Sequence, residues 1–171
     1  METLENYQRL NLINQYEILL NLAILRDDKH NIEKYRQYIK ILECGYVREY
    51  YVFFENISEE FSKEESDLVW DILQIYSNIH YSYKKLKSPK ITLEQIRFDG
   101  FDGNNEIYYL DFCKFILLDL KRFGELRENE RNDFNSHGRR CERYKAMQQK
   151  WIEMGKPFEM SEKQIEVLLF K

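Results

Sequence analysis

Length, composition and charge exclude several classes of protein. The chain has 171 residues, of which 43% are hydrophobic and 33% charged. It is therefore long enough to bury a core without disulfides or a metal, and too polar for an integral membrane protein. With Gly 6 and Pro 2 it lacks the turn residues of a many-stranded sandwich or barrel. Its net charge of -4 argues against non-specific binding to nucleic acid. Taken together, the scarcity of turn residues and the high charged fraction predict a helical protein that does not enter a membrane.

The first 45 residues show two stretches of helical spacing. A helix capped near Thr3 carries two apolar stripes, one of Leu10, Ile13, Leu20 and Ile24 and one of Leu12, Tyr16, Leu19 and Ala23. A second helix over residues 32–42 ends at Gly45, a residue typical of helix C-termini. We therefore predict an N-terminal antiparallel helix hairpin over residues 1–45, attached to a multi-helix bundle body over residues 46–171 that forms one cooperative unit.

Capping boxes, in which Ser or Thr is followed three residues later by Glu or Gln, predict where helices of the body begin. Before the first of these boxes, an aromatic segment over residues 47–61 has helical spacing. The box of Ser62 and Glu65 then starts a long helix ending at Ser88 and Pro89, and the box of Thr92 and Gln95 starts a short helix ending at Asp99 and Gly100. The box of Ser161 and Gln164 starts the last helix.

Two further helices are predicted between these boxes. Asp102, a favoured N-cap residue, is predicted to cap a helix that extends to Phe123. Residues 124–138 are polar and aperiodic, so they are predicted to form the longest loop. Residues 141–154 have helical spacing and end at Gly155 and Pro157. The whole chain is thus predicted to be all-α.

The apolar content of the first helix predicts self-association. Around residues 18–25 this helix is apolar nearly all round, which is more surface than one hairpin partner can cover. We therefore expect a homo-oligomer, a dimer or larger. The interface is predicted to contain Leu12, Tyr16, Leu19, Leu20 and Ile24.

One cluster of polar residues offers the groups that an enzyme would need. If the protein is a hydrolase or transferase, the catalytic candidates are Asp102, Glu106, His137 and Arg139, which supply carboxylates, an imidazole and a cation. The segment over residues 99–106 is rich in oxygen ligands, but Ile107 occupies the position where a calcium loop requires glycine. His137 and Cys141 are four residues apart, but the other histidines lie on other elements and no Cys-x-x-Cys or His-x-x-x-His accompanies the pair. We predict no metal and no cofactor, and favour a protein without enzymatic activity.

Basic residues are concentrated between residues 121 and 156, and acidic ones between residues 55 and 67. If the protein is a nucleic-acid-associated regulator, Arg139, Arg140 and Arg143 are the candidates for contacts to phosphate. Since the overall charge is negative, we favour the interpretation that the acidic and basic surfaces meet between helices or subunits.

Cysteine usage and the N-terminal sequence point to the cytoplasm. Cys44, Cys113 and Cys141 are far apart and odd in number, which gives no disulfide framework. The sequence METLENYQRL is polar and acidic, unlike a secretory signal.

Six segments in a fixed order resemble a known bacterial family. They are QRLNLINQYEIL from Gln8, ECGY from Glu43, IYSNIH from Ile75, RFDGFDGNNEIYYL from Arg97, the pair Phe134-Asn135 and ERYKAMQQKW from Glu142. Together they resemble the YfbU family over nearly the whole chain. The resemblance implies an all-helical cytoplasmic protein with an N-terminal hairpin that tends to self-associate, and it implies no activity, cofactor or catalytic residue. We therefore predict an interaction or scaffold protein, with the enzyme and the nucleic-acid regulator as alternatives.

Overall fold

The computed structural model describes residues 3–127 and 133–170. Within these ranges the protein contains helices and no β-strand, which confirms the all-α prediction. The α-helices are α1 (Asn6–Leu25), α2 (Lys29–Cys44), α3 (Lys63–Tyr83), α4 (Ile107–Lys114), α5 (Cys141–Glu153) and α6 (Glu162–Phe170). The 3-10 helices are η1 (Val47–Phe53) and η3 (Gly124–Leu126), and η2 (Phe115–Asp119) is a π-helix that continues α4. None of the helices in the described part is long and apolar enough to cross a membrane.

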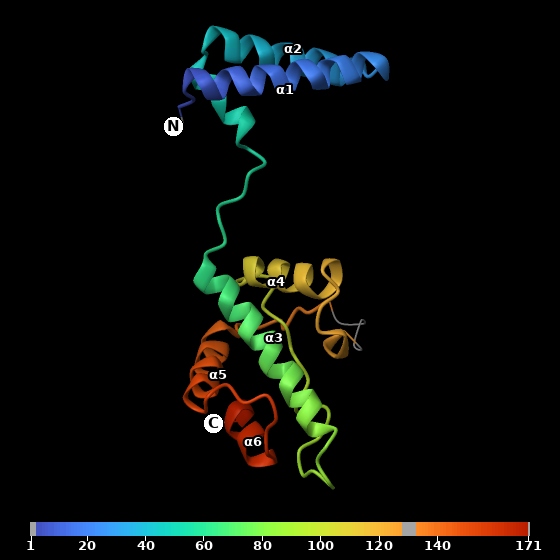
Figure 1. Cartoon of the computed structure of the whole chain (residues 1–171), viewed down its shortest axis with the longest axis vertical. Coiled ribbons are helices and arrows are strands. Elements are labelled where there is room, and N and C mark those ends of the chain that lie inside the picture. Colours follow the sequence, from blue (N-terminus) through green and yellow to red (C-terminus); the bar gives the residue numbers. More distant parts are fainter. Residues whose placement is uncertain (1–2, 128–132, 171) are drawn as a thin grey trace. The chain divides into compact units, whose positions relative to one another are not determined.

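The chain divides into two compact units, Met1–Glu59 and Glu60–Lys171. The division after residue 45 that the sequence suggests stays a prediction. In the first unit, α1 and α2 run side by side (Figure 1). The guanidinium of Arg9, near the start of α1, donates to the carbonyls of Leu42 (2.7 Å) and Glu43 (2.8 Å) at the end of α2. The two helices are therefore antiparallel, which confirms the predicted hairpin.

The first unit buries few apolar side chains. Its buried hydrophobic residues are Ala23, Leu42 and Tyr50. Next to them Tyr16 of α1 contacts Tyr38 of α2 and Phe53 of η1, with ring centroids 5.2 and 5.8 Å apart. The aromatic segment after residue 46 thus packs on the hairpin as a 3-10 helix, η1, and a turn follows its end.

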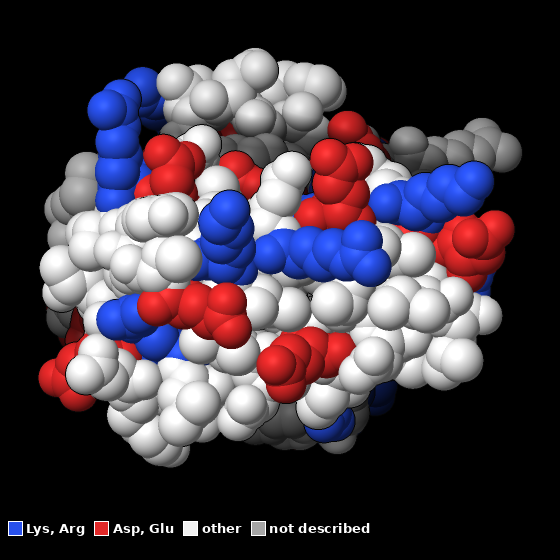
Figure 2. Space-filling view, turned by 90° about the horizontal axis from the view of Figure 1, so that it is seen from above, with Lys and Arg blue, Asp and Glu red and all other residues white. Residues whose placement is uncertain are grey.

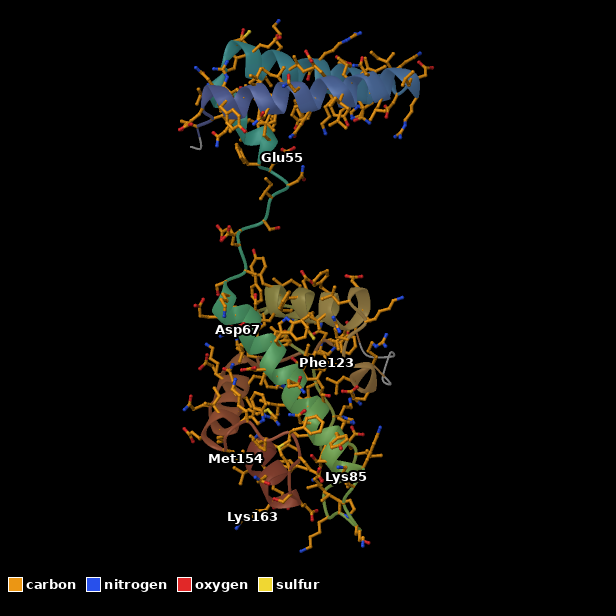
Figure 3. All side chains as sticks on the ribbon, viewed as in Figure 1. Glu55, Asp67, Lys85, Phe123, Met154 and Lys163 are labelled. Atoms are coloured by element: carbon orange, nitrogen blue, oxygen red, sulfur yellow. The ribbon has the colours of Figure 1, made fainter. Side chains whose placement is uncertain are left out.

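The second unit has a larger core built around α3. The capping box of Ser62 and Glu65 forms at its start, with each residue's side chain accepting from the other's backbone N–H (3.1 and 3.2 Å). Apolar side chains of α3 form one buried cluster with residues of α4, α5 and α6, and Figure 3 shows side chains filling the space between these helices. Tyr76 and Tyr144 lie in this core, so these tyrosines serve packing. The box of Ser161 and Gln164 forms at the start of α6.

One predicted helix is a turn instead. Around Thr92 and Gln95 both capping-box hydrogen bonds form (2.8 and 3.4 Å), but they close a turn without a helix after it. The chain leaves helical geometry there because Ile96 and Phe98 both enter the core, which a helix would prevent at this spacing. The predicted end of the long helix is also too late, since α3 ends at Tyr83.

Candidate functional site

Two segments far apart in the sequence pair with each other in the second unit. The N–H of Phe101 donates to the carbonyl of Phe134, and the N–H of Ser136 donates to the carbonyl of Phe101, both at 3.0 Å. Phe101 and Phe134 belong to the family-like segments of the sequence, whereas Ser136 follows the pair Phe134-Asn135. We call the paired residues 99–106 and 133–141 the junction.

Asn135 holds the two sides of the junction together. Its side-chain oxygen accepts from the backbone N–H of Gly103 on one side and of His137 on the other, both at 3.0 Å. One amide oxygen therefore fixes two turns at once. In the sequence Asn135 stands out only as part of the family-like pair, because a single asparagine carries no sign of a partner 32 residues away.

Asp102 stabilises a turn and is not the cap of α4. Its side chain is buried and accepts from the N–H of Asn104 (3.1 Å) and from the amide of Asn105 (2.5 Å). These two hydrogen bonds, with Arg139 nearby, hold the pKa of Asp102 below its ordinary value. The predicted cap is wrong because residues 102–105 form a hydrogen-bonded turn first, and α4 begins at Ile107.

The turn sets an expectation for substitutions of Asp102. Asparagine keeps the oxygen that the backbone N–H of Asn104 needs, and the exposed Asn105 can turn its amide oxygen toward the new NH2 group, so Asp102→Asn should lower the melting temperature only slightly. Asp102→Ala removes that acceptor and should lower it clearly. Thermal melts with and without calcium or magnesium measure both effects. An ion-dependent rise in wild type that Asp102→Asn abolishes would instead identify a metal ligand.

Glu106 caps a helix to which it does not belong. The residue is buried, and its carboxylate accepts from the backbone N–H groups of Arg140 (2.8 Å), Cys141 (2.8 Å) and Asp102 (3.1 Å). Arg140 is the N-cap residue of α5 and makes no side-chain cap of its own, so Glu106 satisfies N–H groups that would otherwise lack an acceptor. Burial raises the pKa of Glu106, but the three backbone hydrogen bonds outweigh burial and hold the pKa below its ordinary value.

The four catalytic candidates all lie in the junction, but two of them are buried and two are exposed. Asp102 and Glu106 are buried, and their oxygens already accept hydrogen bonds from the chain itself. His137 and Arg139 are exposed, and Arg139 donates to the side chain of Asn105 (3.1 Å). This arrangement joins loops and caps α5. A catalytic role for the four residues stays a prediction.

The geometry does not pair His137 with Cys141. His137 precedes α5 with a φ of 51°, whereas Cys141 is the first residue of the helix and is buried. Burial, together with the hydrogen bond to Glu106, raises the pKa of the Cys141 thiol to about 12. In residues 3–127 and 133–170, no three His, Cys, Asp or Glu side chains are grouped closely enough to hold a metal ion.

The arginines proposed for nucleic acid are partly engaged within the protein. Asp99 lies 3.4 Å from the Nε of Arg140 and 3.8 Å from a terminal nitrogen of Arg143. Arg143 also donates to the carbonyl of Leu169 (3.1 Å). Figure 2 shows one face of the molecule, on which basic and acidic side chains are interspersed among uncharged ones, and it does not mark these three arginines. Contacts of these arginines to nucleic acid stay a prediction. Arg131 of the basic stretch lies outside the described residues.

A pocket of about 590 Å³ lies beside the N-terminus of α3. It is lined by Ser62, Glu64, Glu65, Leu68, Tyr109, Lys145 and Gln148. The hydroxyl of Tyr109 donates to Glu65 (3.1 Å), and Lys145 pairs with Glu142 (2.8 Å). Burial and the neighbouring Glu65 carboxylate raise the pKa of Tyr109 to about 12. The sequence identifies Glu65 only as half of a capping box. One of its carboxylate oxygens accepts from Ser62 in that box, and the other accepts from Tyr109.

The predicted interface residues of α1 fall into two groups. Leu12, Tyr16 and Leu20 are half-buried, whereas Leu19 and Ile24 are 39% and 48% exposed. A second set of exposed apolar residues lies on the side of the helix opposite Tyr16 and Leu20, and we call it the outer face of α1: Tyr7, Leu10, Ile18, Leu22 and Leu25.

Charges are nearly absent from α1. Its charged residues are Arg9 and Glu17, and Arg9 is used at the end of α2. A helix face that stays in water normally carries charged side chains. The exposed side of α1 is therefore nearly uncharged, and it combines the apolar residues of the outer face with the exposed asparagines Asn11, Asn14 and Asn21.

Comparison with known proteins assigns the chain to a family. The family model described as YfbU domain matches residues 1–169. The UPF0304 protein MJECS11 of Methanocaldococcus jannaschii is 34% identical over 154 residues, which are 86% of this chain and 87% of that protein. The match covers the hairpin, the junction and the helices of the second unit alike, and the chain is therefore a member of the YfbU family.

Proposed function

We propose that this protein works as a homo-oligomeric interaction or scaffold protein whose copies associate through the N-terminal hairpin. The observation that carries the proposal is the outer face of α1. Ile18 and Leu25 are 62% and 83% exposed there, in a helix with almost no charge. Exposed apolar surface of this kind is typical of protein contacts.

The small core of the first unit supports the same proposal. A unit of about 60 residues buries only about 60% of its unfolded surface and is marginally stable even with a well-filled core. Here the buried apolar residues are Ala23, Leu42 and Tyr50. Covering the outer face would add about 25 cal/mol for each Å² of apolar surface removed from water. A second copy thus supplies the core that the hairpin lacks.

The proposal includes a reducing compartment, the cytoplasm. Cys44, Cys113 and Cys141 are free thiols, and Cys44 is exposed. An exposed free thiol persists where the surroundings keep it reduced. This supports a role inside the cell.

Light scattering on the purified chain tests self-association. At micromolar concentration wild type should have the mass of a dimer or a larger oligomer. Ile18→Glu with Leu25→Glu should produce monomers, because both side chains are exposed and glutamate there opposes burial of the outer face without disturbing the hairpin. Leu20 is less suitable, since it is half-buried in the hairpin.

The matched control places two glutamates on α2. Gln37 and Lys40 are exposed there, so Gln37→Glu with Lys40→Glu should leave the mass unchanged. Circular dichroism shows whether each variant keeps its helices. A monomeric wild-type chain contradicts the proposal, as does an oligomer that the changes at Ile18 and Leu25 leave intact.

A further inference from the structure

The segment that follows α3 carries a cluster of lysines. Its exposed lysines are Lys84, Lys85, Lys87 and Lys90, and we call residues 84–90 the lysine loop. From residue 72 to residue 93 the sequence contains no acidic residue. Lys84 is the C-cap residue of α3, where a cation stabilises the helix dipole. Lys87 and Lys90 lie beyond the end of the helix, so stabilisation of α3 does not account for the whole cluster.

Most of this positive charge is not neutralised within the chain. In the described part of the protein, three of the lysines form no ion pair: Lys84, Lys87 and Lys90. Lys85 pairs with Glu159 (2.7 Å). A second carboxylate, that of Glu162, lies against the loop but accepts from the backbone N–H groups of Lys90 and Ile91. The lysine loop therefore presents an excess of positive charge to the solvent.

The lysine loop is anchored to the core of the second unit. Leu86, inside the loop, packs against the core, and Ile91, directly after the loop, is buried. Figure 1 shows this segment beyond the end of α3, at one end of the second unit, and Figure 3 shows Lys163 of α6 toward the same end. An anchored loop presents its lysines without the ordering cost that a flexible segment has on binding.

An exposed aromatic pair adjoins the lysine loop. The ring centroids of Tyr81 and Phe158 are 4.6 Å apart, and the two residues are 41% and 58% exposed. The ammonium group of Lys85 lies 4.3 Å from the centroid of the Tyr81 ring. Lysines beside exposed aromatic rings are typical of protein surfaces that bind at the boundary between lipid headgroups and acyl chains.

We propose that the lysine loop, together with Tyr81 and Phe158, binds the surface of a membrane that contains anionic lipids. The lysines attract the lipid phosphates, and the aromatic rings enter the region between headgroups and acyl chains. The protein then lies on the membrane and does not enter it. This contact is separate from the proposed association of copies, because it uses the second unit and not the hairpin.

The net charge of -4 does not prevent this contact. At physiological ionic strength the interaction between charges is screened over about 8 Å. A membrane at the end of the second unit therefore interacts mainly with the charges nearest to it, which are those of the lysine loop. Each lysine near an anionic membrane strengthens binding about fivefold.

The arrangement of the aromatic rings favours lipid over single-stranded nucleic acid. Bases bind aromatic side chains by stacking on a ring face. The Tyr81 ring is covered by Lys85 and tilted by 46° against Phe158, so the pair offers no flat platform for successive bases. The lysine loop also has no arginine, the residue whose planar guanidinium is favoured in recognition of nucleic acids.

Co-sedimentation with lipid vesicles tests the proposal. Wild type should sediment with vesicles of mixed phosphatidylcholine and phosphatidylglycerol, and not with vesicles of phosphatidylcholine alone. The combined change Lys84→Gln, Lys87→Gln and Lys90→Gln should weaken binding about a hundredfold, from about fivefold for each lysine. Added salt should weaken binding of wild type more than that of this variant, because salt screens the lysine charges.

The matched control removes three exposed lysines elsewhere in the second unit: Lys63, Lys121 and Lys145. Their combined change to glutamine gives the same net charge as the first variant and should leave vesicle binding nearly as in wild type. Phe158→Ser should weaken binding several-fold without changing its salt dependence, because the lost contact is apolar. Circular dichroism shows whether each variant keeps its helices.

The outcomes decide between the possible partners. Wild type that does not bind the anionic vesicles contradicts the proposal, as do equal losses in the two lysine variants. Fluorescence anisotropy with labelled oligothymidine measures the alternative. Binding to this oligonucleotide that requires the lysine loop, without binding to vesicles, would assign the loop to nucleic acid and overturn the proposal.

Light scattering distinguishes this inference from the proposed function. The variant changed at Lys84, Lys87 and Lys90 should keep the mass of wild type. A smaller mass would show that the lysine loop is a contact between copies, which contradicts the inference. A monomeric wild type that binds anionic vesicles through the lysine loop would contradict the proposed function and support the inference.

Discussion

Gly100→Ala should destabilise the protein by about 3 to 5 kcal/mol. The left-handed backbone conformation accounts for about 1 to 2 kcal/mol of this loss, and a steric clash accounts for the remainder. The φ of Gly100 is +84°, and a Cβ there would lie 1.8 Å from the carbonyl oxygen of Phe134. That oxygen accepts from Phe101 in the junction, so it cannot move without breaking the pairing. Tyr144 also donates to the carbonyl of Gly100 (3.0 Å) from the core. Urea unfolding followed by circular dichroism measures the loss.

Gly155→Ala is the matched control. Gly155 has a similar φ of +78°, but a Cβ there would meet nothing within 4 Å. The variant should therefore lose only the conformational part, about 1 to 2 kcal/mol. If both variants lose the same free energy of unfolding, the contact between Gly100 and the Phe134 carbonyl is not the reason for a glycine at position 100.

Glu106→Ala should destabilise the protein by about 3 kcal/mol, because it leaves buried backbone N–H groups without an acceptor. The groups are those of Arg140, Cys141 and Asp102. Glu106→Gln should lower the stability nearly as much, since glutamine replaces one accepting oxygen by an NH2 group, which would face backbone N–H groups that are themselves donors. Glu142→Gln, at an exposed position in the first turn of α5, is the control and should have nearly wild-type stability. A small loss at Glu106 would mean that water can replace the carboxylate.

The same carboxylate predicts a pH dependence. The pKa of Glu106 in the folded protein lies below its ordinary value of 4.5. Its ionised form therefore contributes stability that is fully present above pH 4.5 and is lost as the pH falls through the folded pKa. The difference in the free energy of unfolding between wild type and Glu106→Gln should be constant near neutral pH and shrink below pH 4.5. A difference that grows on acidification would contradict the lowered pKa.

Local sequence signals predicted most helix starts correctly, and failed where distant contacts intervene. The box of Ser62 and Glu65 is followed by an apolar helical period, and both signals agree with α3. The box of Thr92 and Gln95 forms the same two bonds, yet no helix follows. A capping box requires only one turn of chain, whereas continuation of the helix depends on where Ile96 and Phe98 are buried.

The candidate site shows the same division. The sequence singled out Asp102, Glu106, His137 and Arg139 by residue type, and all four lie in the junction. It could not show that the Glu106 carboxylate accepts from Arg140 and Cys141, because these contacts span 34 and 35 residues. A carboxylate can be buried where backbone N–H groups donate to it. Since nearly every residue has such an N–H group, the sequence does not show which of them surround the carboxylate.

The sequence by itself determined the helical class, the hairpin and the apolar, nearly uncharged character of α1, because these depend on composition and on periodicity within one helix. The tertiary structure decided which apolar residues the hairpin covers and which it leaves exposed. It also decided that Asp102 and Glu106 are used by the chain's own backbone. Both depend on contacts between residues distant in sequence, such as Phe101 with Phe134 and Arg9 with Leu42. Such contacts are set by the packing of whole helices, which no local pattern specifies.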